Sequence, residues 1–114
     1  MTEKPIVSDD PMYLLLKDGQ IRQFNKNRAE GQAANLVGCD FSGLDLRGME
    51  ADGLDLRNSA FHQTDLRGVD LRAANLEGVT LHEALIAGAY FPMALAADEI
   101  ELSLEHGTRL RYRY

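Results

Sequence analysis

Two histidines are the residues of this chain with the clearest capacity for metal chemistry. His62 and His82 stand twenty positions apart, and Glu83 follows the second of them directly. Imidazole nitrogens and carboxylate oxygens both bind zinc, which proteins hold with three or four such ligands. Because no third strong ligand is predicted beside the two histidines, we expect an exposed pair of imidazoles, with no metal and no cofactor.

Other groups that could support catalysis are not recognisable in the sequence. The single cysteine, Cys39, excludes an intramolecular disulfide and a metal cage built from thiols alone, and we expect it to be an inert small apolar residue. The chain contains no nucleophile elbow, no phosphate-binding loop and no metal-binding helix motif. We therefore predict that the protein is not an enzyme. Only a deep polar pocket at one end of the molecule would support an enzymatic role.

Three arginines alternate with other residues near the end of the chain. Arginine and tyrosine side chains can stack on bases and bind phosphate, and Arg109, Arg111 and Arg113 share one face of this alternating segment. The whole chain nevertheless has eighteen acidic and twelve basic residues, a net charge of −6. Nucleic-acid binding depends on a cationic surface, so we expect none, and an edge strand or a dimer contact explains the tail better.

The size and composition of the chain are those of one small globular domain. Its 114 residues allow one domain with one core. Hydrophobic residues make up 45% of the chain and charged residues 26%, which is not the balance of a disordered protein. No apolar stretch approaches the roughly 20 residues of a membrane span, and the first residues lack the order of a secretory signal. We expect a cytoplasmic protein that makes no membrane contact.

A five-residue repeat occupies residues 34–93. Twelve units fit without a gap, and a large apolar residue stands at the third place in eleven of them. Asp, Asn or Glu takes the second place in eight units, and seven of the ten glycines fall in the fifth place. The exception at the third place is Ala51, whose unit has the bulky Met49 at the first place instead, so the exchange conserves side-chain volume.

A period of five favours a coiled backbone. In an α-helix a five-residue step rotates a side chain by about 140°, which would spread the apolar residues over every face. In one flat strand an odd step sends successive side chains to opposite faces. The third-place residues share a core only if each unit is a short extended segment that ends in a corner. Fifth-place glycines and second-place Asp or Asn residues suit such corners.

These A(D/N)LXX units resemble the pentapeptide-repeat family. The resemblance covers 60 of the 114 residues and implies a short right-handed quadrilateral parallel β-helix of about three coils, with four units in each coil. Residues twenty apart would then lie above one another. We therefore predict an all-β fold whose parts are an N-terminal tail and capping hairpin (1–33), the repeat β-helix (34–93) and a C-terminal cap or dimerisation segment (94–114).

The flanking segments are expected to close the ends of the coil. A Lys-Asp-Gly-Gln turn between two apolar runs predicts a β-hairpin over residues 12–24, followed by a short helix capped by Asn25. Residues 97–107 have acids in the first turn, a histidine in the last and a glycine beyond, which favours a helix. The alternation of apolar residues there leaves a strand as the alternative. From residue 108 onward the pattern predicts a final strand.

The outward places of the expected coil contain the candidate interaction surface. On its third face, Asp45 and Asp65 stand beside Arg47 and Arg67, and His62 and His82 stack on the second face. Surface ion pairs contribute only about 0–1 kcal/mol each, so they are explained either by a solvated face or by a recognition strip. We predict a rigid, non-catalytic protein–protein interaction scaffold whose partner the sequence does not identify.

Two further expectations concern the assembly of the protein and an alternative function. An apolar strand end at an open coil edge, with Leu110, Tyr112 and Tyr114, invites a second copy and predicts a homodimer. The resemblance also supplies an alternative function, a DNA mimic that modulates DNA gyrase or topoisomerase. Residues 34–93 have the right sign for this, with nine acids and four arginines. Three coils would span only about 14 Å, however, which is about four base pairs.

Overall fold

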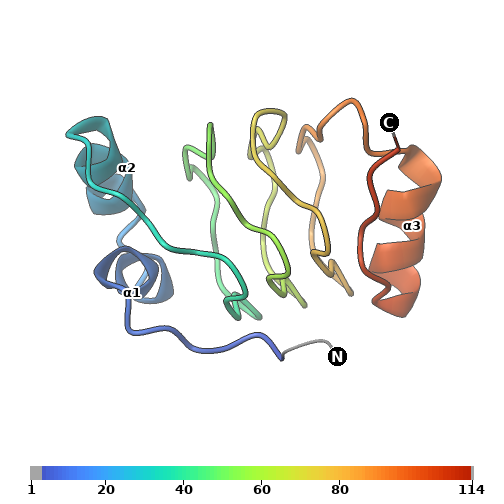
Figure 1. Ribbon diagram of the computed structural model, residues 1–114, viewed down its shortest axis with the longest axis horizontal. Helices are drawn as coiled ribbons and strands as arrows, with labels where there is room; N and C mark the ends of the chain where they lie inside the picture. The colour runs from blue at the N-terminus through green and yellow to red at the C-terminus, as the bar shows by residue number, and fades with distance from the viewer. Residues whose placement is uncertain (1–3, 114) are drawn as a thin grey trace.

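The computed structural model describes residues 4–113, in which a repeat region lies between helical caps. Helices α1 (Pro11–Lys17) and α2 (Ile21–Ala29) cover one end, and α3 (Ala97–His106) covers the other (Figure 1). None of the helices in this part of the chain has the length and apolar character needed to cross a membrane. The molecule measures 36 × 29 × 24 Å along its principal axes.

The prediction of an all-β parallel β-helix is wrong. Within the described residues the regular elements are helices, and no β-strand forms. The repeat region consists of turns joined by isolated bridges, mostly parallel and between residues twenty apart, such as Asp45 with Asp65 and Asp65 with Leu85. The reason is that each unit leaves only a residue or two extended between corners, whereas strands usually need three or more. The expected spacing of twenty is confirmed by these bridges.

Backbone hydrogen bonds connect each turn of the repeat to the next. The N–H of Leu46 donates to the carbonyl of Asp65 at 2.9 Å, and the N–H of Asp65 donates back to the carbonyl of Leu44 at 2.9 Å. This pattern recurs along the region, which therefore consists of three coils of four faces. Coil 1 is 34–53, coil 2 is 54–73 and coil 3 is 74–93. Within each coil the first, second, third and fourth faces are its successive five-residue units.

The third-place side chains fill the axis of the coils. The rings of Phe41 and Phe61 stack with centroids 4.9 Å apart and 12° between their planes, and Ala51 and Met49 are both buried, as the volume exchange predicts. Cys39 is also buried, and burial raises the pKa of its thiol. A thiol with a raised pKa stays protonated and is a poor nucleophile.

The expected N-terminal hairpin is wrong, because two helices form instead. Asp10 caps α1, with its Oδ1 accepting the N–H of Met12 at 2.9 Å, and Pro11 stands at the first helical position. The Lys-Asp-Gly-Gln turn begins at the last residue of α1 and leads into α2, and its Gly19 has a φ of 76°. The spacing of apolar residues along the two helices gives them one apolar face, which is buried against coil 1. This face consists of Met12, Tyr13, Leu16 and Phe24.

Asn25 does not cap a helix either, since it lies inside α2. Its side-chain amide instead donates to the carbonyl of Gly48 at 3.0 Å and accepts the N–H of Glu50 at 3.0 Å. Arg28 donates to the carbonyls of Glu50 and Asp52 at 2.9 and 2.7 Å. Helix α2 thus satisfies backbone groups at the exposed end of coil 1.

At the other end the helix over 97–106 is confirmed as α3, and Gly107 ends it with a φ of 71°. The final strand expected from residue 108 is wrong. The described part of this segment forms one isolated antiparallel bridge, between Thr80 and Arg109, and runs back along one side of α3 (Figure 1).

Candidate functional site

Four Asp-X-Arg triplets of the repeat make the same bidentate contact. In each, Oδ1 of the aspartate accepts the backbone N–H and Nε–H of the arginine, and Oδ2 accepts from Nη2 at 2.7–2.8 Å. The side chains are partly exposed, so each pair adds little to stability by itself. The pairs are Asp45–Arg47, Asp55–Arg57, Asp65–Arg67 and Asp70–Arg72.

The structure brings the predicted strip of Asp45, Arg47, Asp65 and Arg67 together on the third face. Nε of Arg47 lies 3.3 Å from Oδ2 of Asp65, so the pairs of coils 1 and 2 are joined. Hydrogen bonds from Arg67 lower the pKa of Asp65 to about 2, and those from Arg47 lower the pKa of Asp45. The strip is therefore a row of aspartates and arginines whose opposite charges are paired.

The two candidate histidines also lie together. The rings of His62 and His82 have centroids 6.0 Å apart at 82°. Nε2 of His62 is 2.8 Å from Oγ1 of Thr80, and Nε2 of His82 is 3.4 Å from Oε1 of Glu83. Among residues 4–113, no group of three His, Cys, Asp or Glu side chains is placed to hold a metal ion.

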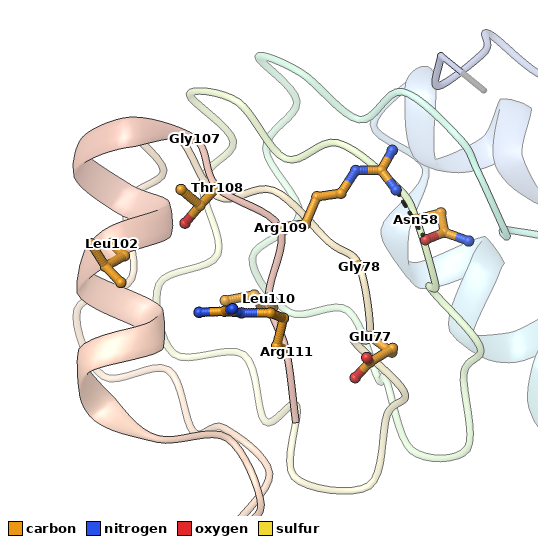
Figure 2. A pocket seen from close by; sticks show the side chains of 9 residues that line it. All are labelled: Asn58, Glu77, Gly78, Leu102, Gly107, Thr108, Arg109, Leu110 and Arg111. Atoms are coloured by element: carbon orange, nitrogen blue, oxygen red, sulfur yellow. Dashed lines mark hydrogen bonds between the residues drawn. The ribbon is translucent and has the colours of Figure 1, made fainter. Parts of the chain in front are cut away.

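A groove of about 770 Å³ lies between α3, the C-terminal segment and the first face of coil 3 (Figure 2). Its charged groups are engaged with neighbours. Arg111 binds Glu99 with two contacts of 3.1 Å, and Glu77 accepts the N–H of Tyr112 at 3.0 Å. Arg109 donates to Oδ1 of Asn58 at 3.5 Å, the contact that Figure 2 marks with a dashed line. No histidine, cysteine or lysine is among the described lining residues, so a general base of these types is missing from the groove.

The predicted edge residues of the C-terminal segment contact coil 3 of their own chain. Leu110 is buried, its N–H donates to the carbonyl of Val79 at 2.8 Å, and its carbonyl accepts the N–H of Gly78 at 2.8 Å. The hydroxyl of Tyr112 accepts the N–H of Leu76 at 2.8 Å. Tyr114 lies outside the described residues.

Helix α3 also accepts hydrogen bonds from backbone N–H groups of coil 3. The N–H of Leu81 donates to Oγ of Ser103 at 2.8 Å, and the N–H of Glu83 donates to the carbonyl of Leu104 at 3.0 Å. The C-terminal segment and α3, together called the C-terminal cap, thus close the first and second faces of coil 3.

An exposed apolar patch on the third and fourth faces of coil 3 is the site that the sequence analysis did not identify. It consists of Leu85 and Tyr90, 50% and 57% exposed, and the fully exposed Met93. Leu85 and Tyr90 occupy the second place of their units, directly above Asp65 and Asp70. The loss of the acidic residue at this place in the last units was the available signal.

Comparison with known proteins rests on the repeat. The sequence profile described as "Pentapeptide repeats" matches residues 34–72 and 64–94, with eight copies. The two ranges together span 34–94, more than half of the 114 residues. No curated protein and no solved structure matches the chain. With twelve fitted units and a family match over most of the coiled region, the chain belongs to the pentapeptide-repeat family.

Proposed function

We propose that this non-catalytic repeat protein is a rigid scaffold that binds another protein through the apolar patch of Leu85, Tyr90 and Met93. These three side chains carry the proposal, because large apolar residues exposed on neighbouring faces of one coil are characteristic of binding surfaces. The paired charges of Asp65–Arg67 and Asp70–Arg72 border it. An apolar centre with a polar rim is the usual anatomy of a protein interface.

The backbone beneath the patch is held in place before any partner arrives. The N–H of Leu85 donates to the carbonyl of Thr64 at 2.9 Å, and the N–H of Tyr90 donates to the carbonyl of Val69 at 3.0 Å. The guanidinium of Arg72 lies 4.9 Å from the centre of the Tyr90 ring. A preorganised surface loses less conformational entropy on binding than a mobile one.

The alternative function, a DNA mimic that modulates gyrase or topoisomerase, has weaker support. A surface that imitates a duplex needs rows of uncompensated negative charge. In the repeat region four of the nine acids are instead paired with arginines at 2.7–2.8 Å. The longest dimension of the molecule, 36 Å, includes the helical caps, so the coiled region that would imitate a duplex is shorter than this.

Affinity capture with matched variants tests the proposed function. The bait is full-length protein in native-host lysate, compared with Leu85→Ser/Met93→Ser and with Val37→Ser, which alters a 40%-exposed apolar residue on coil 1. We expect the wild type and Val37→Ser to retain the same protein, and the double variant to lose it by at least about tenfold. Equal recovery by all three baits would contradict binding through the patch.

A further inference from the structure

The C-terminal cap closes only half of coil 3. On its third and fourth faces, the backbone N–H groups of Ile86, Gly88 and Phe91 have no acceptor among residues 4–113. Ile86 and Phe91 are half-buried, and backbone donors at such positions are normally paired. The equivalent donors of coil 2 are all paired with coil 3 at 2.8–3.0 Å: Leu66 with Leu85, Gly68 with Ala87, and Leu71 with Tyr90.

Two carbonyl groups of the same faces are also unpaired within the described chain, those of Ala84 and Ala89. Their coil 2 equivalents accept N–H groups from coil 3 at 2.9 and 3.0 Å. Residues 84–91 therefore form an open edge, which presents three donors and two acceptors in the same order that joins one coil to the next.

The apolar core is incompletely covered at the open edge. Ile86 and Phe91 are third-place residues, yet both are only partly buried. Their counterparts on the capped faces of the same coil, Leu76 and Leu81, are fully buried. Coverage by the cap explains this difference, so an occupant of the open edge would bury core side chains as well as pair backbone groups.

The other end of the molecule shows that a coil edge accepts an extended segment. The N–H of Ile6 donates to the carbonyl of Gly38 at 2.9 Å, and the carbonyl of Ile6 accepts the N–H of Asp40 at 2.7 Å. This contact forms an isolated parallel bridge between Ile6 and Cys39. The chain's own N-terminal segment thus adds to the second face of coil 1.

We propose that the open edge binds an extended segment of a partner protein as two faces of a fourth coil. This inference rests on the proposed function, since the apolar patch lies on the same faces. The segment is about ten residues long, five for each face, and adds by main-chain pairing. Its carbonyls accept from Ile86, Gly88 and Phe91, and a glycine or asparagine turns its corner above Gly88, whose φ is 72°.

Charge on α3 specifies the kind of segment. The helix has four carboxylates, of which Glu99 pairs with Arg111 on the side of the C-terminal segment. Glu101 lies about 160° around the helix from Glu99, so it is on the flank of α3 opposite the C-terminal segment, which covers the first face of coil 3. No lysine or arginine of the described chain pairs with Glu101 or Asp98. The partner segment therefore has apolar residues at its inward places and lysine or arginine at its outward places.

A designed peptide tests this pairing directly. The probe is the blocked decapeptide Ala-Lys-Leu-Lys-Gly-Ala-Lys-Leu-Lys-Gly, and its control is a scrambled peptide of the same composition. We expect the probe alone to slow amide hydrogen exchange of Ile86, Gly88 and Phe91 by at least about tenfold in NMR spectra. The amides of Leu66 and Gly68, which are already paired, should not change. Equal effects of probe and scramble, or no protection of the edge amides, would overturn the proposal.

Matched variants of the full-length protein locate the binding. Leu85→Lys/Tyr90→Lys places two cations beside the lysines of the probe and should weaken its binding by at least about tenfold. Val37→Lys makes the same type of change at a remote exposed position and should leave binding unaltered. Glu101→Gln should weaken binding and reduce its dependence on salt. Equal binding by the double variant and Val37→Lys would overturn the proposal.

The results also separate this inference from the proposed function. Patch-dependent capture from lysate without protection of the edge amides would refute main-chain pairing and leave the scaffold function in place. Protection of these amides without any peptide, rising with protein concentration together with a doubled mass, would assign the edge to a second copy and overturn the proposal. Protection by the probe with no patch-dependent capture would support the edge and refute the proposed function.

Discussion

At the scale of single residues, most corners of the repeat place their fifth residue in the left-handed region of φ, and three of these residues are not glycine. Asn58, Gln63 and Glu83 have φ values of 61°, 58° and 59°. A side chain with a Cβ costs about 1–2 kcal/mol in this conformation, and asparagine tolerates it better than glutamine or glutamate. The backbone at Glu83 is therefore strained by the residue that occupies it.

Replacing this residue by glycine should stabilise the protein. We expect Glu83→Gly to raise the free energy of unfolding by about 0.5 kcal/mol, because the relief of strain exceeds the entropy that glycine adds to the unfolded chain. Gly43→Ala should lower the free energy of unfolding by about 1 kcal/mol, because Gly43 has a φ of 75°. A Cβ there would meet nothing within 4 Å, so the loss reports backbone strain and not crowding. Urea denaturation followed by circular dichroism measures both. Shifts of the same sign would show that strain does not decide stability at these corners.

Asp65 gives the third face a pH dependence with a definite sign. Hydrogen bonds from Arg67 lower its pKa from 3.8 to about 2. Because the folded pKa lies below the unfolded value, the contact stabilises the fold fully above about pH 4, and this contribution disappears as the pH falls toward 2. Carbon-13 NMR titration should place the Asp65 midpoint at about 2, and Arg67→Gln should raise it. An Asp65 midpoint unaffected by Arg67→Gln would contradict this assignment.

At the scale of elements, α3 is held to coil 3 by a buried hydroxyl. Oγ of Ser103 accepts the N–H of Leu81 at 2.8 Å and donates to the carbonyl of Thr108 at 2.6 Å. Ser103→Ala leaves both backbone groups without this partner and should reduce the free energy of unfolding by about 1–3 kcal/mol. Ser42→Ala is the exposed control. Thermal unfolding and the exchange rate of the Leu81 amide measure the effect, and equal stabilities of the two variants would contradict it.

The helical elements also show what sequence reasoning could and could not predict. The helix over 97–106 was predictable because its acids, His106 and Gly107 are local signals. The N-terminal hairpin was wrong because a Lys-Asp-Gly-Gln turn fits between helices as well as between strands. Asp10 followed by Pro11 was the local signal for a helix start. The repeat and its register of twenty were predictable, but bridges too short to form strands were not.

Prediction of the candidate site divides in the same way. The contacts of Asp45 with Arg47 and of Asp65 with Arg67 follow from spacing within single units, so they could be predicted from the sequence. The apolar residues at the second place were visible in the sequence, but their exposure was not. Whether Leu85 is covered depends on where α3 and the C-terminal segment lie, and these positions are set by packing between distant segments.

At the scale of the whole molecule, the ends of a short coiled protein decide whether it stays apart from its neighbours. Exposed backbone donors and acceptors at such an end can pair with another chain. The N-terminal end is closed by α1, α2 and the segment around Ile6, and the C-terminal cap closes the first and second faces of coil 3. The two faces of the open edge are then available for binding, while the closed faces limit uncontrolled association.

Detaching the C-terminal cap should therefore expose the backbone groups of the first and second faces of coil 3 and allow the protein to self-associate. Leu110→Asp buries a carboxylate in an apolar site and should lower the free energy of unfolding by about 3 kcal/mol. It should also cause self-association, because the cap partners of Gly78 and Val79 would be displaced. Leu102→Asp, at a 41%-exposed position on α3, is the control. Thermal unfolding and light scattering measure both effects, and a Leu110→Asp variant as stable and as dispersed as Leu102→Asp would show that the cap does not protect these faces.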